Sequence, residues 1–162
     1  MADKVLTGAG ERLRKAWGVL AEKPGGKWLF SYLVGRMAPY SGTVGGLVTE
    51  LRPGHARVVL RDRRKVRNHL GSIHAIALMN LGELATGLAT VASLPPGSRS
   101  ILTGLSMEYL KKARGTITAV CHVSIPEALE RREETVEGAL TDAVGDVVAR
   151  VSAKWLVGPE AK

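Results

Sequence analysis

One carboxylate stands alone in the longest apolar stretch of the chain. Glu83 is the only charged residue between Ser72 and Ala92. No lysine or arginine lies within one helical turn of it, so burial should raise the pKa of this carboxyl unless water or a cation reaches it. A carboxylate with a raised pKa is suited to act as a general base or as a nucleophile.

The start of the same stretch predicts a second chemical feature. Ser72 is a favourable helix-capping residue, and residues 72–75 are expected to form a helix N-terminus. The backbone amides there have no partners within the helix, and the helix dipole favours negative charge near them. The amides of Ala75 and Ile76 could polarise a carbonyl and stabilise an oxyanion. Together with Glu83, this pattern indicates acyl transfer.

Each of these residues also has a structural interpretation. His74 is more often a helix-start residue with a local hydrogen bond, and Asn68 is suited to cap a turn. Glu83 by itself is as often structural as catalytic. The four positions Ile76, Asn80, Glu83 and Gly87 follow helical spacing, which predicts that they share one stripe of the helix.

The elements that position these residues can be read from periodicity and turn signals. Residues 8–38 read as two helices, broken at Pro24-Gly25-Gly26 and stopped at Pro39. Residues 44–62 predict a hairpin around Arg52-Pro53-Gly54-His55. A basic linker and the long apolar helix follow, and Pro95-Pro96-Gly97 ends it. Alternating polar and apolar residues predict four more strands, at 99–110, 115–125, 133–141 and 145–157.

This order predicts an α+β fold. A helix that is apolar on nearly every side must be buried on every side, and an antiparallel sheet curled around it achieves this. The helix is also long enough to span a bilayer, but His74, Asn80 and Glu83 would be costly in lipid. We therefore expect a central helix wrapped by six strands.

Composition excludes some kinds of site but does not identify the function. The 162 residues are 45% hydrophobic and carry a formal net charge of +8, which favours anionic partners. Cys121 is the only cysteine, so an intrachain disulfide and a cysteine metal cluster are excluded. We expect Cys121 to pack in a strand. The charged N-terminus does not read as a signal peptide, and we expect a cytoplasmic protein.

Two motifs resemble a known family. The run NHLGSIHAIALMNLGE, residues 68–83, resembles the hotdog-fold acyl-CoA thioesterases of the phenylacetate-pathway type, especially their uncharacterised bacterial branch. Those proteins have an Asn, a Gly three residues later, a His-Gly-Gly three residues after that, and an acidic residue nine past the His. Asn68, Gly71, His74 and Glu83 match that spacing without a gap. Residues 107–115, MEYLKKARG, are similar to the strand that follows the family's helix.

The resemblance implies a fold and a set of roles. It implies a hotdog domain over residues 40–158, with an N-terminal helical segment at 1–39 packed on it, as a single domain overall. It implies catalysis by Glu83 as base or nucleophile, with the Ala75 amide holding the carbonyl oxygen, Asn68 orienting water or substrate, and His74 supporting the loop. The implied substrate contacts are Gly71, Ile76, Asn80 and Tyr109.

The resemblance also implies partners. Coenzyme A would enter only as part of the substrate, with no separate cofactor and no metal. Its phosphates would meet Lys111, Lys112, Arg114 and Arg67, and the basic residues Arg63, Arg64 and Lys65 are a second candidate set with Arg67. Because the family's site lies between two subunits, a homodimer or a dimer of dimers is expected.

One departure from the family pattern keeps alternatives open. The family's His-Gly-Gly is His74-Ala75-Ile76 here, and Ile76 adds bulk where glycine allows close approach. This favours, as the first alternative, a hotdog protein that binds acyl-CoA or acyl carrier protein without hydrolysis. A hydratase lacks support because no Asp-to-His pair has the usual spacing. Nucleic-acid binding rests on the charge and on RDRRKVR, without a reader motif or many aromatics.

Overall fold

Three helices precede the sheet in the computed structural model, which describes residues 8–125 and 130–159. They are α1 (Ala9–Leu20), α2 (Gly26–Met37) and α3 (Pro39–Val44). Gly25 has a φ of 72°, a left-handed conformation that glycine adopts without strain, and it turns the chain from α1 into α2. Residues 1–7 of the predicted N-terminal segment lie outside the described residues.

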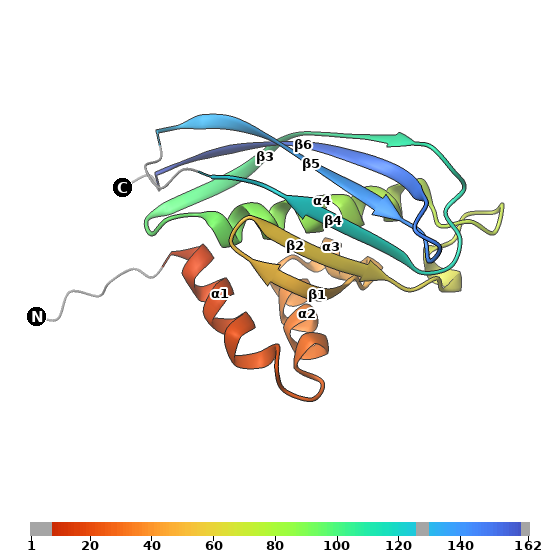
Figure 1. The fold of residues 1–162 in the computed structure, drawn as a ribbon, viewed down its shortest axis with the longest axis horizontal. Coiled ribbons are helices and arrows are strands. Elements are labelled where there is room, and N and C mark those ends of the chain that lie inside the picture. Colours follow the sequence, from red (N-terminus) through yellow and green to blue (C-terminus); the bar gives the residue numbers. More distant parts are fainter. Residues whose placement is uncertain (1–7, 126–129, 160–162) are drawn as a thin grey trace, which may run out of the picture.

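Six antiparallel strands form one sheet, as predicted. They are β1 (Leu47–Arg52), β2 (His55–Leu60), β3 (Ser98–Tyr109), β4 (Ile117–His122), β5 (Arg132–Thr141) and β6 (Val147–Pro159). Their order across the sheet is β1-β2-β4-β5-β6-β3, so β1 and β3 are the two edges (Figure 1). The predicted hairpin around residues 52–55 is β1–β2, closed by Gly54 at φ 77°.

The sheet curves around a central helix. Register shifts occur between Val48 and Glu50, between Leu102 and Gly104, and between Leu140 and Thr141. Such irregularities bend a strand and increase its local twist. They allow the sheet to wrap α4 (Ala75–Ser93), which packs against all six strands (Figure 1). The predicted hotdog architecture is therefore confirmed.

Helix α4 supplies the centre of the core. Leu81, Ala85 and Ala89 are almost completely buried against sheet residues such as Val58 and Ile117. Burial of a large aliphatic side chain contributes about 1.5–3 kcal/mol, so this interface is a main source of stability. Within the described residues, α4 is the one helix long and apolar enough to cross a membrane, but 61% of that stretch is buried inside the protein, as in a core helix.

The N-terminal helices are fastened to the sheet and to α4 by specific contacts. Trp17 of α1 and Phe30 of α2 pack edge to face, with ring centroids 5.0 Å apart. The Ser31 hydroxyl accepts a hydrogen bond from the Val48 amide of β1 at 2.8 Å. The Arg14 guanidinium donates to the Ala92 carbonyl at the end of α4, at 2.7 Å.

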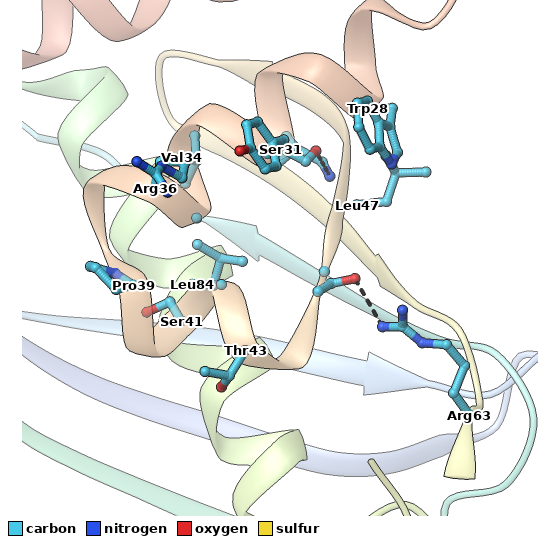
Figure 2. A pocket seen from close by; sticks show the side chains of 16 residues that line it. Trp28, Ser31, Val34, Arg36, Pro39, Ser41, Thr43, Leu47, Arg63 and Leu84 are labelled. Atoms are coloured by element: carbon cyan, nitrogen blue, oxygen red, sulfur yellow. Dashed lines mark hydrogen bonds between the residues drawn. The ribbon is translucent and has the colours of Figure 1, made fainter. Parts of the chain in front are cut away.

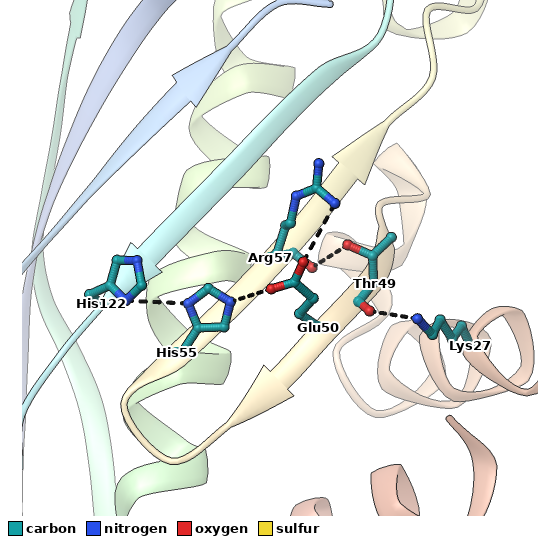
Figure 3. A network of polar contacts seen from close by, with 6 residues as sticks. All are labelled: Lys27, Thr49, Glu50, His55, Arg57 and His122. Carbon is teal, nitrogen blue, oxygen red and sulfur yellow. Dashed lines mark hydrogen bonds and ion pairs between the residues drawn. The ribbon is translucent and has the colours of Figure 1, made fainter. Parts of the chain in front are cut away.

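A polar network extends from α2 across the first strands (Figure 3). The Lys27 ammonium donates to the Thr49 carbonyl at 2.9 Å. In β2, His55 is buried and its Nε2 lies 2.8 Å from Glu50 Oε2, while its Nδ1 lies 3.3 Å from Nδ1 of His122 in β4. The hydrogen bond from His55 lowers the pKa of Glu50. This network satisfies a buried imidazole at the hairpin end of the sheet.

The start of the long helix and the role of Pro39 differ from what the sequence predicted. The long helix begins at Ala75 and is capped by His74, not by Ser72. The Ile73 amide instead bonds the Ala113 carbonyl and the His74 amide bonds the Val66 carbonyl, so the backbone there joins neighbouring loops. Pro39 ends α2 as predicted, but it also occupies the first turn of α3, where its missing N–H costs nothing.

Candidate functional site

Glu83 lies in the middle of α4, under the short helix α3. Its side chain is half-buried, and the Ser41 hydroxyl of α3 donates to its Oε2 at 3.4 Å. Burial raises the pKa of Glu83, and the long hydrogen bond from Ser41 opposes this only in part. Glu83 takes part in no ion pair within the described residues, so the predicted uncompensated carboxylate is present.

An aromatic ring packs against Gly87, one turn along α4 from Glu83. A Cβ placed on Gly87 would lie 3.1 Å from the Trp155 ring and 3.8 Å from Glu83 Oε1. The indole of Trp155, in β6, therefore occupies the space that glycine leaves on this side of α4.

Asn80 lies one turn before Glu83 and is also covered by α3. Its Nδ2 donates to the Tyr40 carbonyl at 3.5 Å, and its Oδ1 is buried with no hydrogen-bond partner in the described part of the chain. A buried carbonyl oxygen without a donor costs free energy. The positions of the predicted stripe therefore differ in exposure: Asn80 is buried, whereas Ile76 is 53% exposed.

The start of α4 presents one backbone donor to solvent. His74 Nδ1 accepts from the Ile76 amide at 3.1 Å, so the imidazole caps the helix and uses one of the two predicted oxyanion donors. The Ala75 amide has no acceptor among the described residues, and residues 74–76 are exposed. Ala75 therefore remains as the donor that could meet an anion at the helix N-terminus.

Asn68 organises the loop before the helix. Its Oδ1 accepts from the amides of Leu70 and Ser72, at 2.9 and 3.2 Å. Gly71 follows with a φ of 70°, a conformation that favours glycine. Asn68 therefore caps the turn, which is its structural interpretation. The spacing from Asn68 to Gly71 places a glycine where this loop needs a positive φ.

The second motif lies beside this loop. The Tyr109 hydroxyl donates to the Ala75 carbonyl at 2.9 Å, and the Ala113 carbonyl accepts from the Ile73 amide at 2.8 Å. The turn after β3 is thereby held against the start of α4. The two sequence motifs, Asn68–Glu83 and Met107–Gly115, are brought together at one end of the helix.

The basic residues of the two candidate sets differ in their surroundings. Lys111 lies 2.8 Å from Asp142 and 2.6 Å from Asp146, and these carboxylates raise its pKa. Arg67 is paired with Asp62 at 2.6 Å. Within residues 8–125 and 130–159 the structure gives no ion pair to four other members of these sets, Lys112, Arg114, Arg64 and Lys65, and all four are exposed.

The two predicted catalytic features are far apart within one chain. Eight residues separate Ala75 from Glu83, which corresponds to a rise of about 12 Å along the helix. A reacting carbonyl needs the oxyanion donor within about 3 Å and the base within hydrogen-bond reach, directly or through one water. One chain therefore does not bring its own Glu83 and its own Ala75 amide to the same carbonyl.

Sequence reasoning missed three contributors to this site. Ser41, Tyr40 and Trp155 contact or cover the Asn80–Glu83 part of α4, yet they lie about 40 or more residues away in the chain. The signal available in the sequence was Gly87, because a small residue on an otherwise apolar helix often marks close packing. Nothing identified its partner as Trp155.

The described residues contain no group of three or more histidine, cysteine, aspartate or glutamate side chains that could hold a metal ion. Cys121 is buried in β4, as predicted, and burial raises the pKa of its thiol to about 12. A thiol so rarely ionised is not a nucleophile at neutral pH.

Comparisons with known proteins agree on the architecture. A family model described as a domain of unknown function (DUF4442) matches residues 26–157. The crystal structure of the genomics target APC5556 is similar with 34% identity and a TM-score of 0.80, over 92% of this chain and 99% of that one. None of the curated proteins matches the sequence.

More distant solved structures share the fold. The Pseudomonas aeruginosa protein PA5026, described as of unknown function and a probable thioesterase, is 24% identical, with a TM-score of 0.72, over 80% of this chain and 93% of that one. A thioesterase family protein from Silicibacter pomeroyi is 15% identical with a TM-score of 0.69, over 94% of this chain and all of that one. These likenesses extend the fold to proteins that carry a thioesterase description.

Proposed function

The chain belongs to the DUF4442 family of hotdog-fold proteins, and on that premise we propose that it hydrolyses acyl-CoA thioesters. The observation that carries the proposal is the half-buried carboxylate of Glu83, which has a raised pKa and no ion-pair partner in the described structure. The thioesterase descriptions of structures with the same fold support the same reaction class.

In the proposed reaction Glu83 is the general base. Its Oε2 accepts from Ser41, so Oε1 is available to take a proton from water. The water oxygen attacks the thioester carbonyl carbon, the carbon–sulfur bond breaks, and the thiolate leaves as free coenzyme A after receiving that proton. The products are a carboxylic acid and a thiol, and no metal or separate cofactor is required.

The oxyanion donor is proposed to come from a second copy of the chain. Because Ala75 and Glu83 of one helix are about 12 Å apart, the Ala75 amide of the partner copy would complete the site. The edge strand β3 supports such pairing, since one side of its backbone has no neighbouring strand in the sheet order. Ile101 on β3, Tyr109 and Leu110 also leave apolar surface exposed near this edge.

The phosphates of coenzyme A are proposed to meet the turn after β3. Lys112 and Arg114 are the better candidates, because they are exposed and the described structure gives them no ion pair. Lys111 and Arg67 already contact carboxylates, so a phosphate would have to compete for them. Acyl-CoA thioesters are intracellular metabolites, and we accordingly propose a cytoplasmic protein with a small-molecule partner.

The test is release of free thiol from acyl-CoAs of different chain lengths, with the wild type beside Glu83→Gln. We expect hydrolysis by the wild type and loss of most of it, about a hundredfold or more, in the variant, since general-base catalysis typically contributes 10²–10⁴-fold. Equal rates for the two proteins would show that Glu83 is not the base.

One observation favours a second candidate, a hotdog protein that binds acyl thioesters without cleaving them. Ile76 is 53% exposed at the helix start, and its amide is already bonded to His74. Its branched side chain would hinder the approach of a carbonyl to the Ala75 amide. Saturable binding of acyl-CoA with no thiol release from any substrate would support this candidate over the first.

A further inference from the structure

A cavity of about 680 Å³ lies between α2, α3 and the start of β1 (Figure 2). Its volume is within the range of small-molecule sites, about 300–1,000 Å³. The residues that line it come mainly from the helices that precede the sheet, and the start of β1, Arg63 and Leu84 of α4 complete its wall. The N-terminal helices therefore do more than cover the core, because they form the walls of a cavity that is open to solvent on one side.

The walls of this cavity suit an apolar ligand. Val34, Leu47 and Leu84 contribute aliphatic surface, and Trp28 and Tyr32 contribute aromatic rings stacked 5.7 Å apart. No carboxylate is among the described residues that line it. An apolar group that enters such a space leaves water and gains contacts along its whole length.

One of the two cationic residues that line the cavity is already engaged by backbone carbonyls. The Arg63 guanidinium donates to the Val44 carbonyl at 2.7 Å, which ties α3 to the linker after β2. It also donates to the Gly45 carbonyl at 3.4 Å, the hydrogen bond drawn in Figure 2. Arg36 is exposed at the end of α2. These hydrogen bonds occupy the Arg63 guanidinium and keep this wall of the cavity in place.

The cavity lies next to the candidate catalytic carboxylate, although Glu83 itself is not among the described residues that line it. Ser41 lines it, and the same hydroxyl donates to Glu83 Oε2 at 3.4 Å. Leu84, the next residue after Glu83, also lines it. A carbonyl that reacts at Glu83 would therefore have the cavity beside it, in reach of the group attached to that carbonyl.

Glycines fix the size of this space. A Cβ on Gly42 of α3 would lie 2.7 Å from the Gly35 carbonyl oxygen of α2, so these two helices touch through their backbones. A Cβ on Gly46 would lie 2.9 Å from the Val58 side chain. Larger residues at these positions would force the helices or β1 to move, so the glycines hold α2 and α3 at a short and fixed spacing.

We propose that this cavity binds the acyl chain of the substrate, as an unbranched aliphatic chain of medium or greater length, and that the N-terminal helices thereby set chain-length specificity. The inference rests on the proposed thioesterase function. A short acyl group would leave the apolar walls in contact with water, whereas a longer chain would cover them. Ser41 then lies where the chain meets the reacting carbonyl.

Leu47 offers the sharpest test because it lines the cavity from the first residue of β1 and is only half-buried. Leu47→Trp should narrow the cavity, and Leu47→Ala should enlarge it. Val19→Trp, which adds the same ring to an exposed position of α1, is the matched control. The quantity measured is kcat/KM for butanoyl-, octanoyl-, dodecanoyl- and hexadecanoyl-CoA.

For Leu47→Trp we expect the ratio of kcat/KM for dodecanoyl-CoA over butanoyl-CoA to fall about tenfold or more, since small changes in an apolar pocket alter discrimination on this scale. Leu47→Ala should keep or raise the ratio, and Val19→Trp should leave it as in the wild type. An unchanged ratio in folded Leu47→Trp overturns the proposal. Thr43→Trp, at an exposed position on the same cavity, provides the same test if Leu47→Trp does not fold.

Binding separates this inference from the proposed function. Dodecanoyl-CoA is titrated into Glu83→Gln and into Glu83→Gln combined with Leu47→Trp, by calorimetry. Weaker binding in the double variant by about tenfold supports the acyl cavity even if no protein shows hydrolysis, in which case only the proposed reaction fails. Equal binding by the two proteins overturns the cavity assignment whatever the turnover.

Discussion

The Ser41 hydroxyl donates a hydrogen bond to Glu83 Oε2 across 3.4 Å, which joins the short helix α3 to the central helix α4. The hydrogen bond links residues 42 positions apart and places a segment outside the central helix next to its only carboxylate. The negative charge of the carboxylate is only partly stabilised, because one long hydrogen bond does not replace the water that would surround an exposed carboxylate. Removal of the Ser41 hydroxyl should therefore change the pKa of Glu83, and removal of the Glu83 charge should change how stability depends on pH.

Glu83→Gln should stabilise the protein at neutral pH. Because burial raises the folded pKa above the ordinary value of 4.5, ionisation of Glu83 weakens the fold as pH rises from 4.5 through the raised pKa. The glutamine has no such cost and can still accept from Ser41. The melting temperatures of variant and wild type should be similar at pH 4 and differ at pH 8, with the variant higher. A variant that melts lower at pH 8 would contradict the buried charge.

Ser41→Ala should move the pH profile of hydrolysis. The Ser41 hydrogen bond lowers the pKa of Glu83 against the larger effect of burial, so its loss raises that pKa further. A base works only when deprotonated, and the acidic limb of kcat/KM should therefore shift to higher pH. Ser41→Thr, which keeps the hydroxyl, should leave the limb close to that of the wild type. A uniform loss of rate at all pH values would show that Ser41 acts otherwise.

Gly82→Ala should destabilise the core by about 1–3 kcal/mol, the usual cost of overpacking. A Cβ at this position of α4 would lie 2.9 Å from Val151 Cβ and 3.0 Å from Met107 Cε. Gly18→Ala in α1 is the matched control, because no atom lies within 4 Å of its Cβ position. That control should stabilise by about 0.5–1 kcal/mol, since alanine favours helix over glycine. Urea denaturation measures both changes, and stabilisation by Gly82→Ala would refute this packing.

The wild type should be at least dimeric at micromolar concentration. Ile101 is 50% exposed on the edge strand β3, so Ile101→Lys places a charge on the surface expected to meet a second copy. The dissociation constant should rise about tenfold or more, as expected when an apolar side chain at the centre of an interface is replaced by a charged one. Multi-angle light scattering across a dilution series checks this, with Val144→Lys, in an exposed turn, as control. A monomeric wild type would argue against a site shared between two copies.

Much of the fold was predictable from local pattern. The hairpin around residues 52–55 followed from turn residues between β-branched runs, and β1–β2 has that turn. The apolar stretch after residue 72 predicted a buried helix, and α4 packs on every strand. The helix start was placed too early, because the amides of Ile73 and His74 bond the Ala113 and Val66 carbonyls, and such distant contacts leave no periodic signal.

The candidate site was predictable only in part. Glu83 could be selected because a lone charge on an apolar helix is conspicuous, and its raised pKa follows from burial. Its neighbours Ser41 and Trp155 could not, and neither could α3, since a helix of six residues is too short for periodicity to show. The pattern of basic residues likewise gave no sign that Lys111 and Arg67 form ion pairs with carboxylates.

The sequence by itself determined most of the helices and strands, which faces of them are apolar, and which carboxylate lacks a local partner, because each of these depends on neighbours within a few turns. Only the tertiary structure decided that α2 and α3 form the walls of a cavity next to Glu83, since these walls come from residues 28–48 together with Arg63 and Leu84. It also placed the Ser41 hydroxyl of α3 beside Glu83. Contacts of this kind arise from packing between distant segments, which no local pattern records.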